Sequence, residues 1–227
     1  MLFLERSLSN VTVDHHSDFV LWRRGSLSIY LNRGLANDAA FDKMADPDCF
    51  FDLADCRIIK DQRKIKVARF EIDVEGKPKA VYLKRYNAFS WRYRVLSLFQ
   101  SSGAVRSLRG VAILAESGIQ TARPLAAMES RSWGMLNKSF FLSEEIEQAK
   151  TADAYWCEEL QTLKATAGMQ KQRQFLSGMG ELFRFLHERG VYHNDLKDAN
   201  ILVGPHFTGA ADQFYLSTSR ASVATAS

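Results

Sequence analysis

Residues 192–203 read Tyr-His-Asn-Asp-Leu-Lys-Asp-Ala-Asn-Ile-Leu-Val. An Asp follows the His by two positions, a Lys follows that Asp by two, and an Asn follows it by five. Upstream, six apolar residues recur at helical spacing: Phe175, Leu176, Met179, Leu182, Phe183 and Leu186. Gly190 then stops the helix. The sequence therefore predicts a core helix, a short strand at Val191-Tyr192, a polar loop and a second short strand.

The spacing in the polar loop is that of the catalytic loop of kinases, H-x-D-x-x-x-x-N. Asp195 would accept the proton of the attacking hydroxyl and Lys197 would offset the charge of the transferring phosphate. Asn200 would hold a magnesium ion. The alternative is a surface turn in which Asp and Asn cap backbone amides. Asn194 stands where many protein kinases have an Arg that binds a phosphorylated activation loop, which favours kinases of small molecules, sugars or lipids.

Composition sets broad bounds. The chain has 227 residues and a net charge of +4, which suits one domain or two small lobes and an anionic ligand or surface. Its three cysteines lack metal-ligand spacing and are expected to be reduced thiols. No apolar run is long enough for a membrane span, and Glu5 and Arg6 interrupt any signal-like core. We therefore expect a cytoplasmic protein with peripheral membrane contact.

The first half of the chain shows strand patterns. Residues 64–72 alternate polar and apolar, a turn follows, and residues 80–86 form a second predicted strand. Lys84 follows an apolar run, as the phosphate-binding Lys of kinases does, although a strand Lys is also common at a solvated edge. Residues 139–146 read as a buried strand entering a connector. Its Glu144, Glu145 and Ile146 would bind the adenine of ATP through their backbone.

A mostly β first part and a mostly α second part predict an α+β protein with the two-lobed plan of protein kinases. The predicted division has an N-terminal segment of uncertain structure over 1–54 and a β-rich N-lobe with its hinge over 55–147. A partial, truncated α-helical C-lobe would occupy 148–227. The tail from about 217 is small, polar and without periodicity, so we expect it to be disordered.

The chain resembles the lipopolysaccharide kinases, the Kdo and heptose kinases of Gram-negative bacteria, from about Lys64 to Leu216. The resemblance rests on residues 82–86, 114–125 and 142–145 together with the polar loop. It implies transfer of phosphate from ATP, with Mg²⁺, to an inner-core sugar of lipopolysaccharide or a lipid A precursor at the cytoplasmic face of the inner membrane.

A cluster of cations interleaved with aromatic residues suits lipid phosphates, although it could equally be a solvated face. Its cations are Lys84, Arg85, Arg92, Arg94, Arg106 and Arg109. No nucleic-acid motif accompanies this cluster, so nucleic acid is not an expected partner.

Two departures from the kinase pattern bear on activity. The Glu that pairs with the strand Lys would fall near Ser107, whereas Glu116 lies nine residues later. The magnesium-binding Asp expected within about two residues of the predicted strand 214–216 is missing, and a small polar tail follows instead. This change suggests a truncated or frame-shifted product with weak or absent turnover. The alternatives are a pseudokinase that still binds nucleotide or lipopolysaccharide, and a kinase of another small molecule or of a protein.

Overall fold

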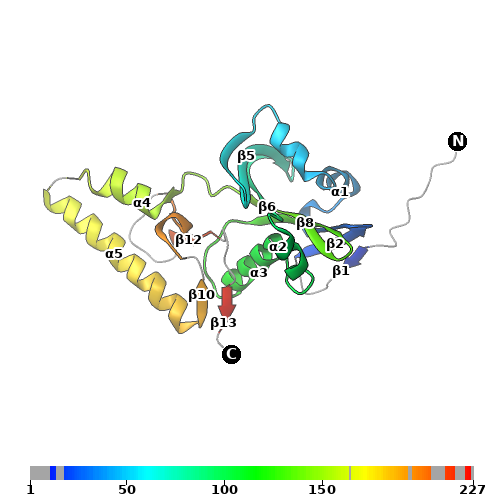
Figure 1. Cartoon of the computed structure of the whole chain (residues 1–227). Helices are drawn as coiled ribbons and strands as arrows, with labels where there is room; N and C mark the ends of the chain where they lie inside the picture. The colour runs from blue at the N-terminus through cyan, green and yellow to red at the C-terminus, as the bar shows by residue number, and fades with distance from the viewer. Residues whose placement is uncertain are drawn as a thin grey trace. The chain divides into compact units, whose positions relative to one another are not determined.

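The computed structural model describes residues 11–13, 18–163, 165–193, 196–205, 213–217 and 223–225. The chain divides into two compact units (Figure 1). Unit 1 comprises Met1–Val105 and Pro124–Glu144, and unit 2 comprises Arg106–Arg123 and Glu145–Ser227. Each unit has its own cluster of buried apolar residues, so each is described separately.

Unit 1 contains an eight-stranded sheet whose neighbouring strands are all antiparallel, in the order β1-β2-β3-β7-β8-β6-β5-β4. The strands are β1 (Val11–Val13), β2 (Phe19–Arg24), β3 (Leu27–Asn32), β4 (Arg57–Gln62), β5 (Ile65–Val74), β6 (Lys77–Asn87), β7 (Pro124–Ser132) and β8 (Met135–Glu144). The predicted strands near 64–72, 80–86 and 139–146 correspond to β5, β6 and β8. The segment before residue 55, which the sequence left uncertain, contributes β1–β3.

One face of this sheet is apolar and covered. Leu83 of β6 lies opposite Ala68 of β5 and Leu142 of β8, and all three are fully buried. Helix α1 (Asp38–Met44) and the 3₁₀ helix η2 (Pro47–Asp52) belong to the same core, and Figure 1 shows α1 beside the sheet. Phe50 of η2 stacks on the Phe70 ring at 5.1 Å between centroids. Side chains alternate along a strand, so the residues between these point to the other face.

The other face of the sheet is more polar and meets the first turn of a helix. Helices α2 (Trp91–Leu96) and α3 (Gly103–Glu116) follow β6. The Ser90 hydroxyl accepts a hydrogen bond from the Tyr93 amide at 3.2 Å, which caps α2. A Cβ atom on Gly103 would lie 2.6 Å from the Tyr86 ring, so α3 approaches this face too closely for any larger residue.

The apolar pattern near residues 104–117 predicts a helix that ends at Gly118, and α3 ends just before that glycine. Gly118 has φ of 73°, and the Ile119 amide donates to the Leu114 carbonyl at 2.8 Å. The same pattern places Val105, Leu108, Ala112, Leu114 and Ala115 on the buried side. Val105 and Leu114 are buried as predicted, whereas Ala112 and Ala115 are exposed. The buried side is formed by residues spaced three or four apart: Ala104, Ser107, Val111 and Leu114.

Unit 2 is built on a long helix. Helix α4 (Ala152–Tyr155) and the π-helical turn η3 (Trp156–Leu160) precede α5 (Ala165–Glu188), and Gly190 follows with φ of 62°. Phe175, Leu182 and Leu186 are buried as predicted. Leu176 and Phe183, also predicted in the core, are instead 57% and 41% exposed because they lie beside the buried stripe, about a quarter turn around the helix.

Short strands complete unit 2. They are β9 (Lys150–Thr151), β10 (Val191–His193), β11 (Ile201–Val203), β12 (Phe214–Leu216) and β13 (Val223–Thr225). Strand β11 pairs with both β9 and β12, and the 3₁₀ turn η4 (Asp198–Asn200) leads into it. Strand β13 pairs with β10, which differs from the disorder expected for this part of the tail. The pairing uses backbone groups alone, so an aperiodic sequence does not reveal it.

The described part of the chain contains no helix long and apolar enough to cross a membrane. Cys49, Cys56 and Cys157 are all free thiols, as the sparse cysteine content predicts. Burial raises the pKa values of Cys49 and Cys56, which keeps both thiols protonated at neutral pH. The architecture is the expected α+β type, with a β-rich first unit and helices concentrated in the second.

Candidate functional site

Lys84 lies on the polar face of the unit 1 sheet. In the strand register it stands opposite Val67 of β5 and Phe141 of β8. The residue is half-buried, and burial lowers the pKa of its ammonium group to about 8. No carboxylate contributes to this shift, so the ammonium gains no charge compensation from the residues described. A cation held in this way favours an anionic ligand such as a phosphate group.

The neighbouring cation has a different task. Arg85 points to the apolar face, where its Nη1 atom lies 2.8 Å from the Asp48 Oδ1 atom. Lys138 contacts the same carboxylate, and hydrogen bonds from the two cations hold the Asp48 pKa below its usual value despite the opposing effect of burial. The expected cluster of cations is therefore divided, with Arg85 fastening η2 to the sheet rather than meeting phosphates.

Glu144, Glu145 and Ile146 lie where strand β8 ends. Glu144 is the last residue of β8, and the boundary between the two units falls directly after it. The Ile146 carbonyl accepts a hydrogen bond from the Ala149 amide at 3.2 Å, and Gln148 has φ of 58°. Glu144 is still paired with Val81 of β6, whereas Glu145 and Ile146 follow the strand and lead into a turn that leaves the sheet.

The polar loop lies between β10 and β11 in unit 2. Asn194 and Asp195 lie outside the described residues, so the structure does not place the predicted proton acceptor. Lys197 is exposed, and its carbonyl accepts a hydrogen bond from the Asn200 amide at 2.8 Å. Asn200 is only 4% exposed, at the end of η4. Because it is buried, the Asn200 side chain is held firmly in place.

The start of the tail lies beside Asn200. The Ser217 amide donates to the Asn200 carbonyl at 2.9 Å and extends the pairing of β11 with β12 by one residue. Strand β12 therefore brings the residue after Leu216 to the position where the sequence argument requires a carboxylate. That residue is Ser217, and Asp212 lies outside the described residues. Within the described ranges, no group of three or more His, Cys, Asp or Glu residues could hold a metal ion. Beside each other at this point, Asn200 and Ser217 offer an amide and a hydroxyl, a donor pair that suits Mg²⁺ less well than a carboxylate would.

The residues that follow α3 hold strand β12 in place, a role that the sequence did not reveal. After α3 ends, the Gln120 carbonyl accepts from the Leu216 amide at 3.0 Å. The Thr121 hydroxyl donates to the Leu216 carbonyl at 2.9 Å. The run Gly118-Ile119-Gln120-Thr121, noted at the sequence level only as part of a resemblance, thus ties α3 to the strand that precedes Ser217.

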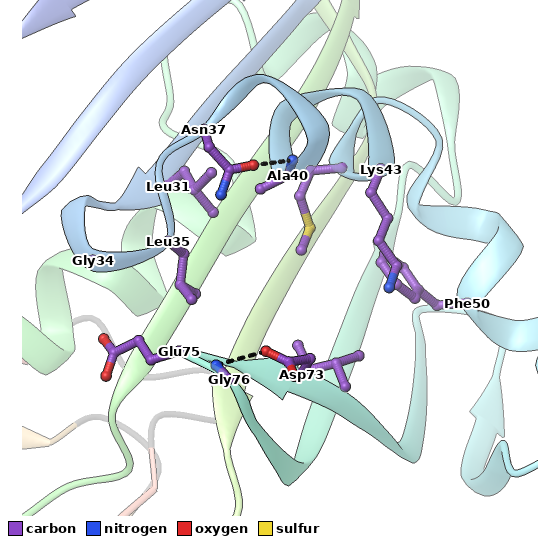
Figure 2. Close-up of a pocket in the computed structure, with 12 residues that line it drawn as sticks. Leu31, Gly34, Leu35, Asn37, Ala40, Lys43, Phe50, Asp73, Glu75 and Gly76 are labelled. Atoms are coloured by element: carbon purple, nitrogen blue, oxygen red, sulfur yellow. Dashed lines mark hydrogen bonds between the residues drawn. The ribbon is translucent and has the colours of Figure 1, made fainter.

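A pocket of about 260 Å³ in unit 1 lies away from Lys84 (Figure 2). Leu31, Phe50 and Ile72 line it and belong to the apolar core between the sheet and its covering helices. Figure 2 shows Lys43 beside the Phe50 ring, at 5.7 Å from its centroid, and Asp73 accepting from the Gly76 amide. Because Lys84 points to the other face of the sheet, this pocket is not part of the predicted phosphate site.

Comparison with solved structures defines the class of fold. The structure of WaaP in complex with acyl carrier protein matches with a TM-score of 0.53 and 16% sequence identity, over 82% of this chain and 70% of that one. A MAP kinase from Leishmania major, LmaMPK10, gives a TM-score of 0.43 and 21% identity, over 73% of this chain and 45% of that one. At this identity the WaaP match establishes the fold alone, which is the protein-kinase-like fold.

The family follows from the sequence. The model of the lipopolysaccharide kinase (Kdo/WaaP) family matches residues 55–217, which is more than half of the chain. The chain therefore belongs to the lipopolysaccharide kinase (Kdo/WaaP) family, as its sequence motifs predict. No curated protein matches it.

Proposed function

We propose that the chain is an ATP-dependent phosphotransferase acting on an inner-core sugar, Kdo or heptose, of lipopolysaccharide or its lipid A precursor. The observation that carries this proposal is the family match over residues 55–217, which includes Lys84 and the polar loop. We further propose that it works at the cytoplasmic face of the inner membrane. The proposed division remains an N-terminal segment over 1–54, an N-lobe over 55–147 and a C-lobe over 148–227.

Each residue in the proposed site has one role. Lys84 binds the triphosphate, and its lowered pKa supports this role because a phosphate would supply the missing charge compensation. The backbone at Glu144, Glu145 and Ile146 binds adenine. Asp195 accepts the proton of the sugar hydroxyl, and Lys197 stabilises the charge that develops on the transferring phosphate.

Asn200 is the proposed metal ligand, and the missing carboxylate limits what it can do. In kinases the metal supplies much of the charge stabilisation of phosphoryl transfer. The chain offers a buried amide at Asn200 but Ser217 beside it. We therefore expect weak or absent turnover from this chain.

The same observation favours a second candidate function, a pseudokinase that binds nucleotide without transferring phosphate. Binding of a ligand to the folded state raises the melting temperature, so the two candidates can be separated by thermal shift. A kinase shows magnesium-dependent stabilisation by ATP together with phosphate transfer. A pseudokinase shows stabilisation by ATP with or without magnesium and no transfer.

The test of nucleotide binding uses a matched pair of lysines. Lys84→Met should abolish stabilisation by ATP. Lys66→Met should retain it, because Lys66 lies on the opposite face of the sheet, 3.6 Å from Asp61. If both variants lost stabilisation by ATP equally, or both retained it, Lys84 would not be a nucleotide-binding residue.

The test of transfer uses ATP labelled at the γ-phosphate and a lipid A precursor carrying Kdo and heptose. Asp195→Asn should still be stabilised by ATP while losing whatever transfer the wild type shows. If phosphate were transferred to a small molecule or a protein but not to this acceptor, the proposed substrate would be wrong and the proposed kinase activity would stand.

A further inference from the structure

One end of the unit 1 sheet exposes large apolar side chains to water. They lie on α2, on the loop after it and at the β7–β8 turn. Trp91, Leu96, Leu98, Phe99 and Trp133 are 71%, 54%, 46%, 87% and 95% exposed, respectively. We call these five residues the apolar tip. Exposed apolar residues grouped in this way mark a contact surface more often than residues exposed singly.

The apolar tip is a built structure and not a loose loop. The Arg131 Nη1 atom donates to the Ser97 carbonyl at 2.8 Å and to the Gly134 carbonyl at 2.9 Å. The Leu136 amide donates to the Ser97 hydroxyl at 2.8 Å, and a Cβ atom on Gly134 would lie 3.0 Å from Leu98. These polar contacts join the end of α2 to the β7–β8 turn and hold the apolar side chains outward.

Trp133 adopts a backbone conformation that large residues rarely take. Its φ is 53° and that of Gly134 is 77°, so both residues of the two-residue turn are left-handed. Asn-Gly or Asp-Gly is the usual pair in such a turn. An indole in this strained position, almost fully exposed, gains nothing from the fold itself, which points to a function for it outside the chain.

Cations surround the apolar tip. Arg131 donates its amide hydrogen to the Ser26 carbonyl at 2.8 Å, which places the β2–β3 turn beside the β7–β8 turn. Residues 23–26, 91–100 and 131–138 contain six Arg or Lys and no Asp or Glu. Arg131 pairs with Glu129, and Lys138 contacts Asp48, while Arg23, Arg24 and Arg92 are exposed. This end of the sheet is therefore apolar at its tip and basic around it.

We propose that the apolar tip docks the chain on an anionic phospholipid surface. Trp133 and Trp91 would enter the headgroup region, where amphipathic rings are favoured, and Phe99, Leu96 and Leu98 would reach the acyl boundary. Arg23, Arg24 and Arg92 would meet lipid phosphates. The proposal deepens the proposed function, on which it rests for placing the chain at a membrane.

The experiment measures binding to vesicles that contain neither lipopolysaccharide nor ATP. The full chain is sedimented with vesicles of phosphatidylethanolamine and phosphatidylglycerol, and separately with phosphatidylcholine alone. We expect binding to the anionic vesicles, weakened by added salt, and little binding to the neutral ones.

Variants locate the contact. Trp133→Asn suits the left-handed turn and so should fold, and Phe99→Ser removes a ring that is almost fully exposed. Each should weaken partition into anionic vesicles by about tenfold, the effect of burying one large apolar side chain. Arg23→Gln and Arg24→Gln should each weaken it by about fivefold. Ile59→Thr, on the exposed strand β4, is the matched control and should bind as the wild type does.

Three results would overturn the proposal. The wild type could fail to bind anionic vesicles, or the tip variants could bind as well as Ile59→Thr. The chain could instead form a dimer in solution that Trp133→Asn abolishes without vesicle binding, which would assign the tip to a second copy. Failure here leaves nucleotide binding and phosphate transfer untouched, because neither is measured with these vesicles.

Discussion

Lys84 shows what a single residue contributes to stability and to binding. Its pKa of about 8 in the folded chain lies below the ordinary value of 10.5 because burial disfavours the charged form. Below pH 8 the ammonium is charged in both the folded and unfolded states, so its desolvation opposes folding in full. Between pH 8 and 10.5 the folded chain loses this proton first, so the opposition fades as the pH rises.

This linkage predicts the behaviour of Lys84→Met. At pH 7 the variant should be more stable than the wild type, by roughly 0.5–2 kcal/mol in the free energy of unfolding, the usual size of a stabilising substitution. The difference should shrink by pH 10. Urea denaturation at the two pH values measures it. A variant less stable than the wild type at pH 7 would show that the ammonium has a partner that stabilises the fold.

The missing carboxylate is also a matter of one residue. Ser217 is the first residue after β12, within the window where the sequence argument expects the Asp, and its amide donates to the Asn200 carbonyl. Ser217→Asp should make ATP binding magnesium-dependent, with affinity in magnesium raised by about tenfold or more. Ser217→Asn, which carries a side chain of the size of Asp without the charge, is the control. Calorimetric titration of ATP with and without Mg²⁺ gives the answer, and equal magnesium dependence in both variants would contradict the prediction.

At the scale of elements, α5 shows how a helix divides between core and solvent. Leu182 is 3% exposed and packs in the unit 2 core, whereas Leu176 is 57% exposed. Leu182→Ala should lower the free energy of unfolding by about 2–5 kcal/mol, through lost burial and the cavity left behind. Leu176→Ala should change it by less than about 0.5 kcal/mol. Chemical denaturation of both variants tests the pair, and equal losses would mean that a partner covers Leu176.

Several elements were predictable because their signals are local. The apolar periodicity of α5, the alternation in β5 and β6, and the glycines at 118 and 190 act within one or two turns of chain. The sequence did not predict helix α2 because the helix is short and buries no side chain, so it lacks the apolar periodicity of a helix packed against a core. The segment before residue 55 stayed uncertain because its strands β1–β3, which pair with one another, join the rest of the sheet where Leu27 of β3 lies opposite Ser130 of β7, far away in sequence.

At the scale of the whole molecule, the two cores predict two independent responses. Phe70 is fully buried in unit 1, and Leu182 is buried in unit 2. Phe70→Ala should increase amide exchange in β5, β6 and β8, and Leu182→Ala should do so in α5 and β11, because local opening follows packed units. Hydrogen exchange with mass spectrometry resolves the two regions. Loss of protection throughout the chain in both variants would show that the two units unfold as one.

The candidate site was predictable in its residue types but not in its surroundings. The spacing of residues 193–200 and the strand containing Lys84 led to the predicted kinase-like fold and lipopolysaccharide kinase family, which the fold and the family match confirm. The roles assigned to Lys84, Asp195, Lys197 and Asn200 stay predictions. The opposite orientations of Lys84 and Arg85 follow from strand alternation, but which of the two faces is covered depends on η2, far away in sequence.

The sequence by itself determined the class of fold and the family, because these depend on residue type and short spacing, and it supplied the predicted roles of the polar residues. Only the tertiary structure decided that Arg85 binds Asp48, that Thr121 braces β12, and that Arg131 joins α2 to the β7–β8 turn. Each of these contacts joins residues more than 30 positions apart, and side-chain orientation across such separations is set by how strands pair and helices pack.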